Sequence, residues 1–469
     1  NGPVTNASAL TLTGGTTGNA AVTQTSTGTF NLAGFDATIG SLAGVGSVQL
    51  GSGTLTLGSA NVDTDFAGVI SGNGGLIKTG TATQTLSGAN TFAGATTINQ
   101  GTILVSATGS LAGAVQNNAG FSNSGTVSGL VTNAGTLVSG GRLQGGLVNA
   151  AGATASLANI VDGAVSNSGT ITLTAGLTAN AALNQASGGT INLAGFNATI
   201  GSISGTGAMQ LGGGTLTTGG SNASTVFDGI ISGTGGLAKT GTGTLTLGGS
   251  NTAAANFTGT LSVNAGTLLI NGQMGDVAGN AATLSVANGA TLGGSGNFLG
   301  SIALGTGSIL APGNSPGTLA IGGNLALDAG SILNFELAQA GVVGGGINDL
   351  ITVGGNLTLA GTLNVTTLPG FGEGIYRLFN YGGTLTDNGL LFGQRPAGFT
   401  TSLVTNVAGE ISARFTLGVP TVLYWDGGDL TGSSNATNGN GGSGIWNSNN
   451  GNWTSAPAFS ANFAWGSQT

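Results

Sequence analysis

The sequence predicts an all-β fold in which short parallel strands wind into a right-handed β-helix, also called a β-solenoid. Three observations lead to this prediction. Apolar residues alternate with Thr, Ser or Asn in many short runs, as in 244–247, and this alternation is typical of a strand with one buried face. Gly and Asn separate the runs, and similar runs recur along the chain. Strands this short bury little surface alone, so they predict stacked coils, for which right-handed connections are the rule.

The composition excludes several other classes of protein. The 469 residues include 96 Gly but no Cys and no His, so the fold must rest on burial and backbone hydrogen bonds without disulfides. Only six Lys and Arg are scattered along the chain against 14 Asp and Glu, and the net charge of −8 argues against nucleic acid as a partner. No apolar run approaches the ~18 residues of a membrane helix.

Taken in order, the first ninety residues predict a series of strands and turns. The clearest runs are 10–13, 29–32, 37–39, 47–50 and 54–57. Each is bounded by Gly, Asn or Ser, which favour turns, and no window with helical period competes with them.

The region 115–177 has the clearest periodicity. Four sets of positions recur every 17 residues, which predicts coils of about 17 residues in which the members of a set stack. The sets are Leu130, Leu147 and Ala164; Val131, Val148 and Val165; Gly135, Gly152 and Gly169; and Leu143, Ile160 and Leu177.

A long internal duplication relates 10–105 to 171–270. Phe35 matches Phe196 and Lys78 matches Lys239, in each case 161 residues apart, and a four-residue insertion near 253–256 then changes the offset to 165. Small changes in length of this kind are tolerated in loops between strands.

Beyond the duplication, 284–310 continues the strand pattern and leads to the turn-rich stretch 311–317. Two related blocks, 319–327 and 351–359, follow at a spacing of 32 residues, which predicts wider coils. We therefore expect a continuous solenoid over 1–419. The remainder, 420–469, is rich in Trp, Asn and Gly and predicts a wider coil or the start of a further module, and we expect the natural protein to continue beyond Thr469. No signal peptide is visible at 1–3, so we expect the chain to be either already processed or a fragment.

Residues 236–247 (GLAKTGTGTLTL), followed by 264–268 (NAGTL), resemble the passenger-associated repeat of bacterial autotransporters of the type V secretion pathway. The stretches 311–317, 376–385 and 424–427 are also similar to parts of such passengers. The resemblance implies a right-handed parallel β-helix that is exported to the surface of a Gram-negative bacterium and carried there by the outer-membrane barrel of its own precursor.

Candidate sites for chemistry are few, and the sequence predicts no catalytic residue, no cofactor and no metal. The loop 61–65 has oxygen side chains suited to Ca²⁺, but its duplicate 222–226 lacks both acids, so a solvated loop is the favoured interpretation. Asp426 and Asp429 are the nearest acidic pair to aromatics, and we interpret them as turn residues. Lys78 and Lys239 are interpreted as solubilising charges at the edge of a coil.

The tryptophans offer the best candidate for binding, because Trp beside Asn and Ser can stack on sugars and hydrogen-bond to them. The alternative is that they fill the core of a broader coil. They are Trp425, Trp446, Trp453 and Trp465.

Three functions remain open at this point. The first is a non-enzymatic, surface-displayed or secreted stalk or adhesin, whose repeated faces make weak multivalent contacts with a host cell, a neighbouring cell or a glycan. The second is a subunit that self-associates into an extracellular filament or surface matrix, because the nearly uncharged strands lack the Lys and Glu that discourage edge pairing. The third is a carbohydrate-active β-helix enzyme.

Overall fold

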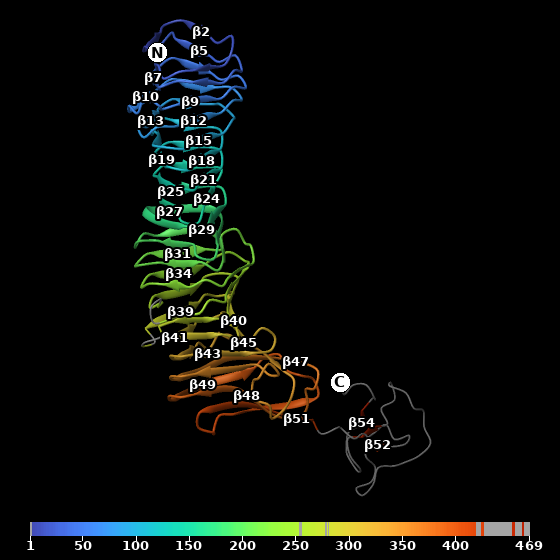
Figure 1. The fold of residues 1–469 in the computed structure, drawn as a ribbon. Helices are drawn as coiled ribbons and strands as arrows, with labels where there is room; N and C mark the ends of the chain where they lie inside the picture. Colours follow the sequence, from blue (N-terminus) through green and yellow to red (C-terminus); the bar gives the residue numbers. More distant parts are fainter. Residues whose placement is uncertain are drawn as a thin grey trace. The chain divides into compact units, whose positions relative to one another are not determined.

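The computed structural model describes residues 2–252, 256–276, 279, 281–418, 424–425, 453–454 and 462–463. All regular elements among them are β-strands, and within these ranges no helix is long and apolar enough to cross a membrane. The chain divides into two compact units, the first made of Asn1–Pro396 and Thr401–Arg414, the second of Ala397–Thr400 and Phe415–Thr469. In the first unit the coils stack along one direction, from the blue N-terminal strands to the orange strands around β49 (Figure 1).

Each coil of the first unit contributes strands to three faces, and each strand pairs in parallel with its counterpart in the next coil. The predicted parallel β-solenoid is therefore confirmed. We number the faces in the order in which the chain visits them. Face 1 contains β1 (Val4–Asn6), β4 (Ala21–Gln24), β7 (Ser41–Gly44), β10 (Thr64–Phe66), β13 (Thr83–Leu86), β16 (Thr102–Val105), β19 (Gly120–Asn123), β22 (Thr136–Ser139), β28 (Thr190–Asn192), β30 (Ala208–Gln210), β33 (Ile231–Ser232), β38 (Gln273–Gly275), β43 (Thr318–Ile321), β46 (Leu350–Val353), β48 (Gly374–Tyr381) and β51 (Glu410–Leu417).

Face 2 lies next along each coil and begins as a separate four-stranded sheet, β2-β5-β8-β11. It contains β2 (Ala9–Thr11), β5 (Thr29–Asn31), β8 (Ser47–Gln49), β11 (Val69–Ser71), β14 (Ala89–Asn90), β17 (Ser110–Leu111), β20 (Thr126–Val127), β23 (Arg142–Leu143), β31 (Thr215–Thr218), β34 (Gly236–Lys239), β36 (Thr260–Val263), β39 (Ala282–Val286) and β44 (Leu325–Leu327).

Face 3 completes the coil. It contains β3 (Thr16–Thr17), β6 (Ala37–Thr38), β9 (Leu55–Leu57), β12 (Leu76–Lys78), β15 (Thr96–Ile98), β18 (Val115–Asn117), β21 (Val131–Asn133), β24 (Leu147–Asn149), β26 (Val165–Asn167), β32 (Thr225–Phe227), β35 (Thr244–Leu247), β37 (Thr267–Ile270), β40 (Thr291–Gly294), β42 (Ile309–Pro312) and β45 (Ile332–Leu337).

Several longer strands continue round a corner from one face to the next. They are β25 (Thr154–Val161), β27 (Thr170–Gln185), β29 (Ala198–Gly205), β41 (Asn297–Leu304), β47 (Leu357–Thr367) and β49 (Leu385–Phe392). The last described elements are β50 (Phe399–Val404) and a small antiparallel sheet of β52 (Tyr424–Trp425), β53 (Trp453–Thr454) and β54 (Asn462–Phe463).

The alternation in the sequence gives each strand an apolar inner face and a hydroxyl-rich outer face. In β35, Leu245 and Leu247 are buried while Thr244 and Thr246 are partly exposed. The same side chains stack from coil to coil, as where Leu245 pairs with Leu268 of the next coil. The core is therefore a narrow column of aliphatic side chains along the coil axis.

The predicted 17-residue stacks are wrong in detail. Val131 pairs with Leu147 and not with Val148, and Leu147 pairs with Val165, so the two steps are 16 and 18 residues. Leu143 likewise pairs with Val161 instead of Ile160. Because successive side chains in a strand point to opposite faces, only these registers keep Leu147 inside, and a shift of one residue would bury its neighbour instead.

A column of amides runs inside the solenoid along face 3. Each Asn Nδ2 donates to the side-chain oxygen of the next coil, at 2.6 Å from Asn117 to Asn133 and 2.8 Å from Asn149 to Asn167. Each of these Nδ2 atoms also donates to a backbone oxygen, such as Thr170 O in the case of Asn149. All five members are fully buried, and together they link five consecutive coils: Asn117, Asn133, Asn149, Asn167 and Gln185.

The interpretation of Lys78 and Lys239 as solubilising charges is wrong, because both side chains are 1% exposed. Lys78 Nζ donates to Thr79 O, Gly80 O and, in the following coil, Gln100 O, at 2.5, 2.8 and 3.3 Å. Lys239 Nζ makes the equivalent three contacts at 2.8 to 3.2 Å. An ammonium has three donors, so three carbonyl oxygens satisfy it and join one coil to the next. Burial lowers the pKa of both lysines.

Candidate functional site

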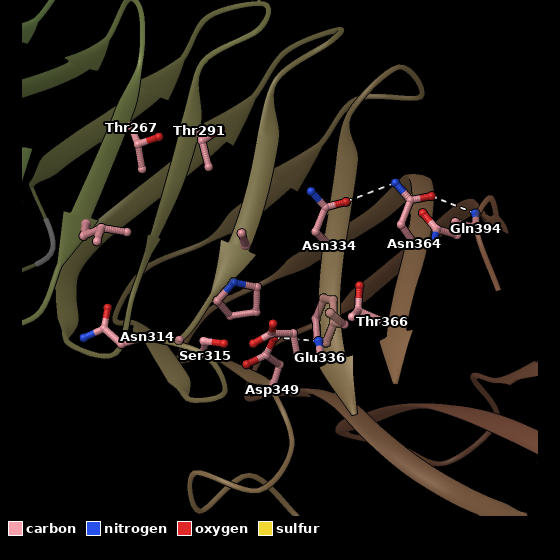
Figure 2. Close-up of a pocket in the computed structure, with 15 residues that line it drawn as sticks. Thr267, Thr291, Asn314, Ser315, Asn334, Glu336, Asp349, Asn364, Thr366 and Gln394 are labelled. Atoms are coloured by element: carbon pink, nitrogen blue, oxygen red, sulfur yellow. Dashed lines mark hydrogen bonds between the residues drawn. The ribbon is translucent and has the colours of Figure 1, made fainter. Parts of the chain in front are cut away.

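A hollow lies on the outer side of face 3, near the end of the first unit. Its volume is about 490 Å³, and its lining comes from six successive coils (Figure 2). Strands β37, β40, β42, β45 and β47 contribute most of the lining, together with the turn after β42. The lining residues are Thr267, Leu269, Thr291, Ala311, Pro312, Gly313, Asn314, Ser315, Asn334, Phe335, Glu336, Asp349, Asn364, Thr366 and Gln394. We call this hollow the face 3 groove.

The groove forms where a row of outward side chains becomes small. Leu269 pairs with Gly293, and Gly293 with Ala311, so two neighbouring coils carry almost no side chain at this position. A methyl group added to Gly293 would lie 2.5 Å from Ala311 O and 3.1 Å from Leu269 Cδ2. Leu269 therefore leans over the floor of the groove.

Amide groups continue the same row beyond Ala311. Asn334 pairs with Asn364, whose Nδ2 donates to Asn334 Oδ1 at 3.0 Å, and Asn364 Oδ1 accepts from Gln394 N at 2.8 Å (Figure 2). The row gives the groove a polar wall of three side chains from consecutive coils. Both the donor and the acceptor of an amide are available along such a wall.

Two carboxyl groups, Asp349 and Glu336, lie together at one end of the groove (Figure 2). Asp349 is 1% exposed, and its two oxygens accept from Gly317 N at 2.8 Å and Glu336 N at 2.7 Å. Burial raises the pKa of Asp349 to about 7, although the two backbone hydrogen bonds act in the opposite direction and nearby Glu336 adds to the rise.

The turn-rich stretch 311–317 forms the edge of the groove beside Asp349. Gly313 has a φ of +88°, and a methyl group there would overlap Gly317 N and lie 2.8 Å from Asp349 Oδ1. Only glycine allows the backbone to approach the carboxyl group this closely. The buried carboxyl group therefore joins the turn at Gly317 to strand β45 at Glu336.

This arrangement is suited to binding more than to catalysis. Both oxygens of Asp349 already accept backbone hydrogen bonds, so the carboxyl group is not free to turn toward a substrate. Glycoside hydrolysis needs a pair of carboxyl groups placed on either side of the scissile bond. The remaining groups are amides, threonine hydroxyls and an apolar floor, which together can hydrogen-bond and pack against a neutral, extended polar chain.

The sequence-predicted residues lie elsewhere. Trp425 and Trp453 are opposite each other in the antiparallel pair β52 and β53, whereas Trp446, Trp465, Asp426 and Asp429 lie outside the described residues. The tryptophan contact therefore stays a prediction.

The acidic loop 61–65 has a structural role in the described coils. Asp63 Oδ1 accepts from Thr83 N of the next coil at 2.6 Å. In the duplicate, Ser224 Oγ takes the place of the carboxylate and accepts from Thr244 N at 3.0 Å. Each position needs one hydrogen-bond acceptor, and a serine meets that need as well as an aspartate. Among the described residues no group of three or more His, Cys, Asp or Glu gathers as a metal site.

Sequence reasoning missed the groove, the internal amide column and the lysine contacts. The amide column had a visible signal, because Asn117, Asn133 and Asn149 recur every 16 residues and Asn167 follows after 18. Asp349 had no such signal, since its burial depends on a turn that lies 32 residues earlier in the chain.

The passenger-associated-transport-repeat family matches residues 48–70, 76–105 and 237–270. The second and third matches include the two buried lysines, Lys78 and Lys239. The chain is also 50% identical over 144 residues to a protein of Brucella suis biovar 1 (strain 1330) named "Adhesin BmaC autotransporter". That alignment covers 30% of this chain and 4% of the relative, so the chain spans a small part of the relative's length.

Proposed function

We propose that this segment of an autotransporter passenger, which is exported to the bacterial cell surface, acts there as a rigid adhesive stalk without enzymatic activity. The observation that carries the proposal is the stack of parallel-paired coils in the first unit. The coils are joined by backbone ladders on three faces, by the internal amide column and by the buried lysines. Each coil adds ~4.8 Å to the stack, so the solenoid holds its outer faces well away from the membrane.

The outer surface supports an adhesive role. Only 4% of the residues are charged, and the outward positions of the strands are mainly Thr, Ser, Asn and small apolar residues. Such a surface suits weak contacts with neutral polar polymers, repeated along the stalk. The face 3 groove is a candidate site of this kind in the first unit. The relative's name, which includes the word adhesin, points to the same class of function.

We expect the partners to be glycans or other polar molecules on host or neighbouring cells, and the chain's own precursor to supply the outer-membrane barrel. Trp425, Trp446, Trp453 and Trp465 remain a second predicted contact with a glycan. The alternatives of a filament subunit and a carbohydrate-active enzyme gain no support from the repeats or from the relative's name.

Surface display tests the proposal. The full 469-residue chain, fused to an autotransporter barrel, is displayed on a non-adherent Gram-negative host, and attachment of these cells to an epithelial monolayer is counted. We expect attachment well above that of cells displaying the barrel alone. A groove variant, Asn334→Ala with Asn364→Ala, should attach less than the wild type, while Thr352→Ala on face 1 is the matched control. Attachment no higher than with the barrel alone would contradict the proposed function.

A further inference from the structure

The lining of the face 3 groove contains acidic groups but no basic group. Asp349 and Glu336 lie together at one end of the groove, and none of the lining residues is a lysine or an arginine (Figure 2). Arg395 follows the lining residue Gln394 in the chain, but its guanidinium donates to Thr401 Oγ1 at 3.4 Å. The acidic end of the groove therefore has no counter-charge in its own lining.

Glu336 is the acid that can reach a ligand. Asp349 is buried, and both of its oxygens accept backbone hydrogen bonds, one of them from Glu336 N. The side chain of Glu336 is partly exposed, and within the described ranges its carboxyl group has no hydrogen bond and no ion pair. A cation at Glu336 would therefore replace no internal contact, and it would also favour the ionised form of Asp349.

Free hydrogen-bonding groups lie beside Glu336 on the same side of the sheet. Glu336 and Asn334 are two residues apart in β45, so both point outward. They pair with Thr366 and Asn364 of the next coil. Asn334 Nδ2 has no partner among the described residues, and Asn364 Nδ2 uses only one of its two hydrogens, for Asn334 Oδ1. The groove therefore presents N–H donors and a hydroxyl next to an unpaired carboxylate.

The spacing of the coils favours a sugar chain over an extended peptide. Equivalent positions recur once per coil, at ~4.8 Å along the axis. An extended polysaccharide advances by nearly this distance with each ring and linkage, so one ring can lie over each coil. An extended peptide advances by ~3.3 Å per residue and falls out of step. Ala311 and Pro312 make part of the groove apolar, which suits the C–H faces of sugar rings.

We propose that the face 3 groove binds a linear polysaccharide with free amino groups, such as a glucosamine polymer, through an ammonium group at Glu336 and hydroxyl groups at Asn334 and Asn364. Charge complementarity selects this ligand, because two acids without a base disfavour sulfated or carboxylated glycans and attract a cation. The amides and hydroxyls suit any neutral polar chain, and Glu336 adds the preference for an amine. This inference rests on the proposed adhesive function and adds the ligand class of its groove.

Calorimetry with the full chain in solution tests the inference. The probes are a glucosamine pentasaccharide and its fully N-acetylated form, which has the same backbone but no positive charge. They are compared at about pH 6, where such an amine is protonated, and at ~0.15 M salt, which screens distant exposed charges. We expect one pentasaccharide per chain and about tenfold tighter binding of the glucosamine form, because a charge-assisted hydrogen bond is stronger than a neutral one.

Three variants locate the selectivity. Glu336→Gln keeps the shape of the side chain but removes its charge, so it should bind the glucosamine form about tenfold more weakly and the N-acetylated form as the wild type does. Asn334→Ala with Asn364→Ala should weaken the binding of both sugars. Glu373→Gln, the same change at an exposed position outside the groove, is the matched control and should bind as the wild type. The two sugars on the wild-type chain decide the ligand class without any variant.

Several results would overturn the inference: equal binding of the two pentasaccharides by the wild type, no binding of the glucosamine form, or a loss in Glu373→Gln as large as in Glu336→Gln. A pentalysine peptide that binds as tightly as the glucosamine form would also overturn it, since the groove would then recognise charge without the sugar. The epithelial assay separates the two levels. If displayed cells attach there but the purified chain does not prefer the amine, the inference fails and the adhesive function stands. If the preference is present without attachment, the adhesive function fails.

Discussion

The internal amide column makes a quantitative prediction at Asn149. Its Nδ2 donates to Asn167 Oδ1 at 2.8 Å and to Thr170 O at 3.2 Å, and its Oδ1 accepts from Asn133 Nδ2 at 2.7 Å. Asn149→Leu keeps the branched shape of the side chain but is larger, and it removes all three hydrogen bonds in a fully buried position. At ~1 kcal/mol each, with more for partners left unpaired, the loss is about 3–5 kcal/mol.

The leucine has two opposing effects. Its extra apolar surface is worth about 1–2 kcal/mol when buried, but its larger volume costs about 1–3 kcal/mol through overpacking, so we expect the free energy of unfolding to fall by about 3–5 kcal/mol. Asn133 Nδ2 still donates to Thr154 O at 2.9 Å, and Asn167 Oδ1 still accepts from Gly169 N at 3.2 Å, which keeps the effect from being larger. Because coils contact mainly their neighbours, the loss should be concentrated in the coils around Asn149.

Urea denaturation and amide hydrogen exchange measure the two parts of the prediction. The denaturation midpoint should fall, and exchange should accelerate in the coils that contain β21, β24 and β26 more than in distant ones. The matched control is Asn118→Leu, the same substitution at an exposed position where Nδ2 reaches Asn99 Oδ1 at 3.2 Å on the surface. An Asn149→Leu chain as stable as the Asn118→Leu chain would refute the reasoning.

Three further predictions concern other parts of the first unit. Lys239→Met should lower the free energy of unfolding by about 2–4 kcal/mol in a urea titration, because three carbonyl oxygens lose their donor. Lys78→Met should lower it independently, so that the two losses add in the double variant. A Lys239→Met chain as stable as the wild type would contradict the role of the lysine in joining coils. Gly259→Ala should be strongly destabilising in thermal melts, since its methyl group would overlap Gly235 O, whereas Gly14→Ala, with open space at the same position, should be tolerated. Asp349 has a pKa raised to about 7 from an ordinary value of ~3.9, so its contribution to stability is complete below about pH 4 and is lost as the pH rises through 7. Asp349→Asn should therefore reduce the loss of thermal stability between pH 5 and pH 8, whereas Asp328→Asn, whose carboxyl pKa is lowered by hydrogen bonds from Gly330 N and the Thr306 hydroxyl, should leave it unchanged.

The sequence was informative about the solenoid because the alternation of Leu with Thr depends only on neighbours along the chain. It was less informative about register, since a spacing of 17 averages steps of 16 and 18 that only the pairing partners distinguish, as Val131, Leu147 and Val165 show. Lys78 was misread for a related reason. A lysine is nearly always exposed, and its burial here depends on the carbonyl of Gln100, which the next coil supplies. The face 3 groove depends on coils as far apart as β37 and β47, so no local pattern predicts it.

The internal duplication shows that residues repeated in the sequence of a solenoid need not lie on the same face of it. A copied segment must keep its apolar residues inside, but each of the three faces offers the same environment, an aliphatic core on one side and water on the other. Phe66, Leu86 and Val105 therefore stack in a column on face 1, whereas Phe227 and Leu247, the duplicates of Phe66 and Leu86, stack in the same way on face 3. Burial constrains which side chains point inward and leaves the face undetermined. A duplication that is not a whole number of coils thus folds as readily as one that is, and the fractional offset moves each copied residue to another face, as with Lys78 in β12 on face 3 and Lys239 in β34 on face 2.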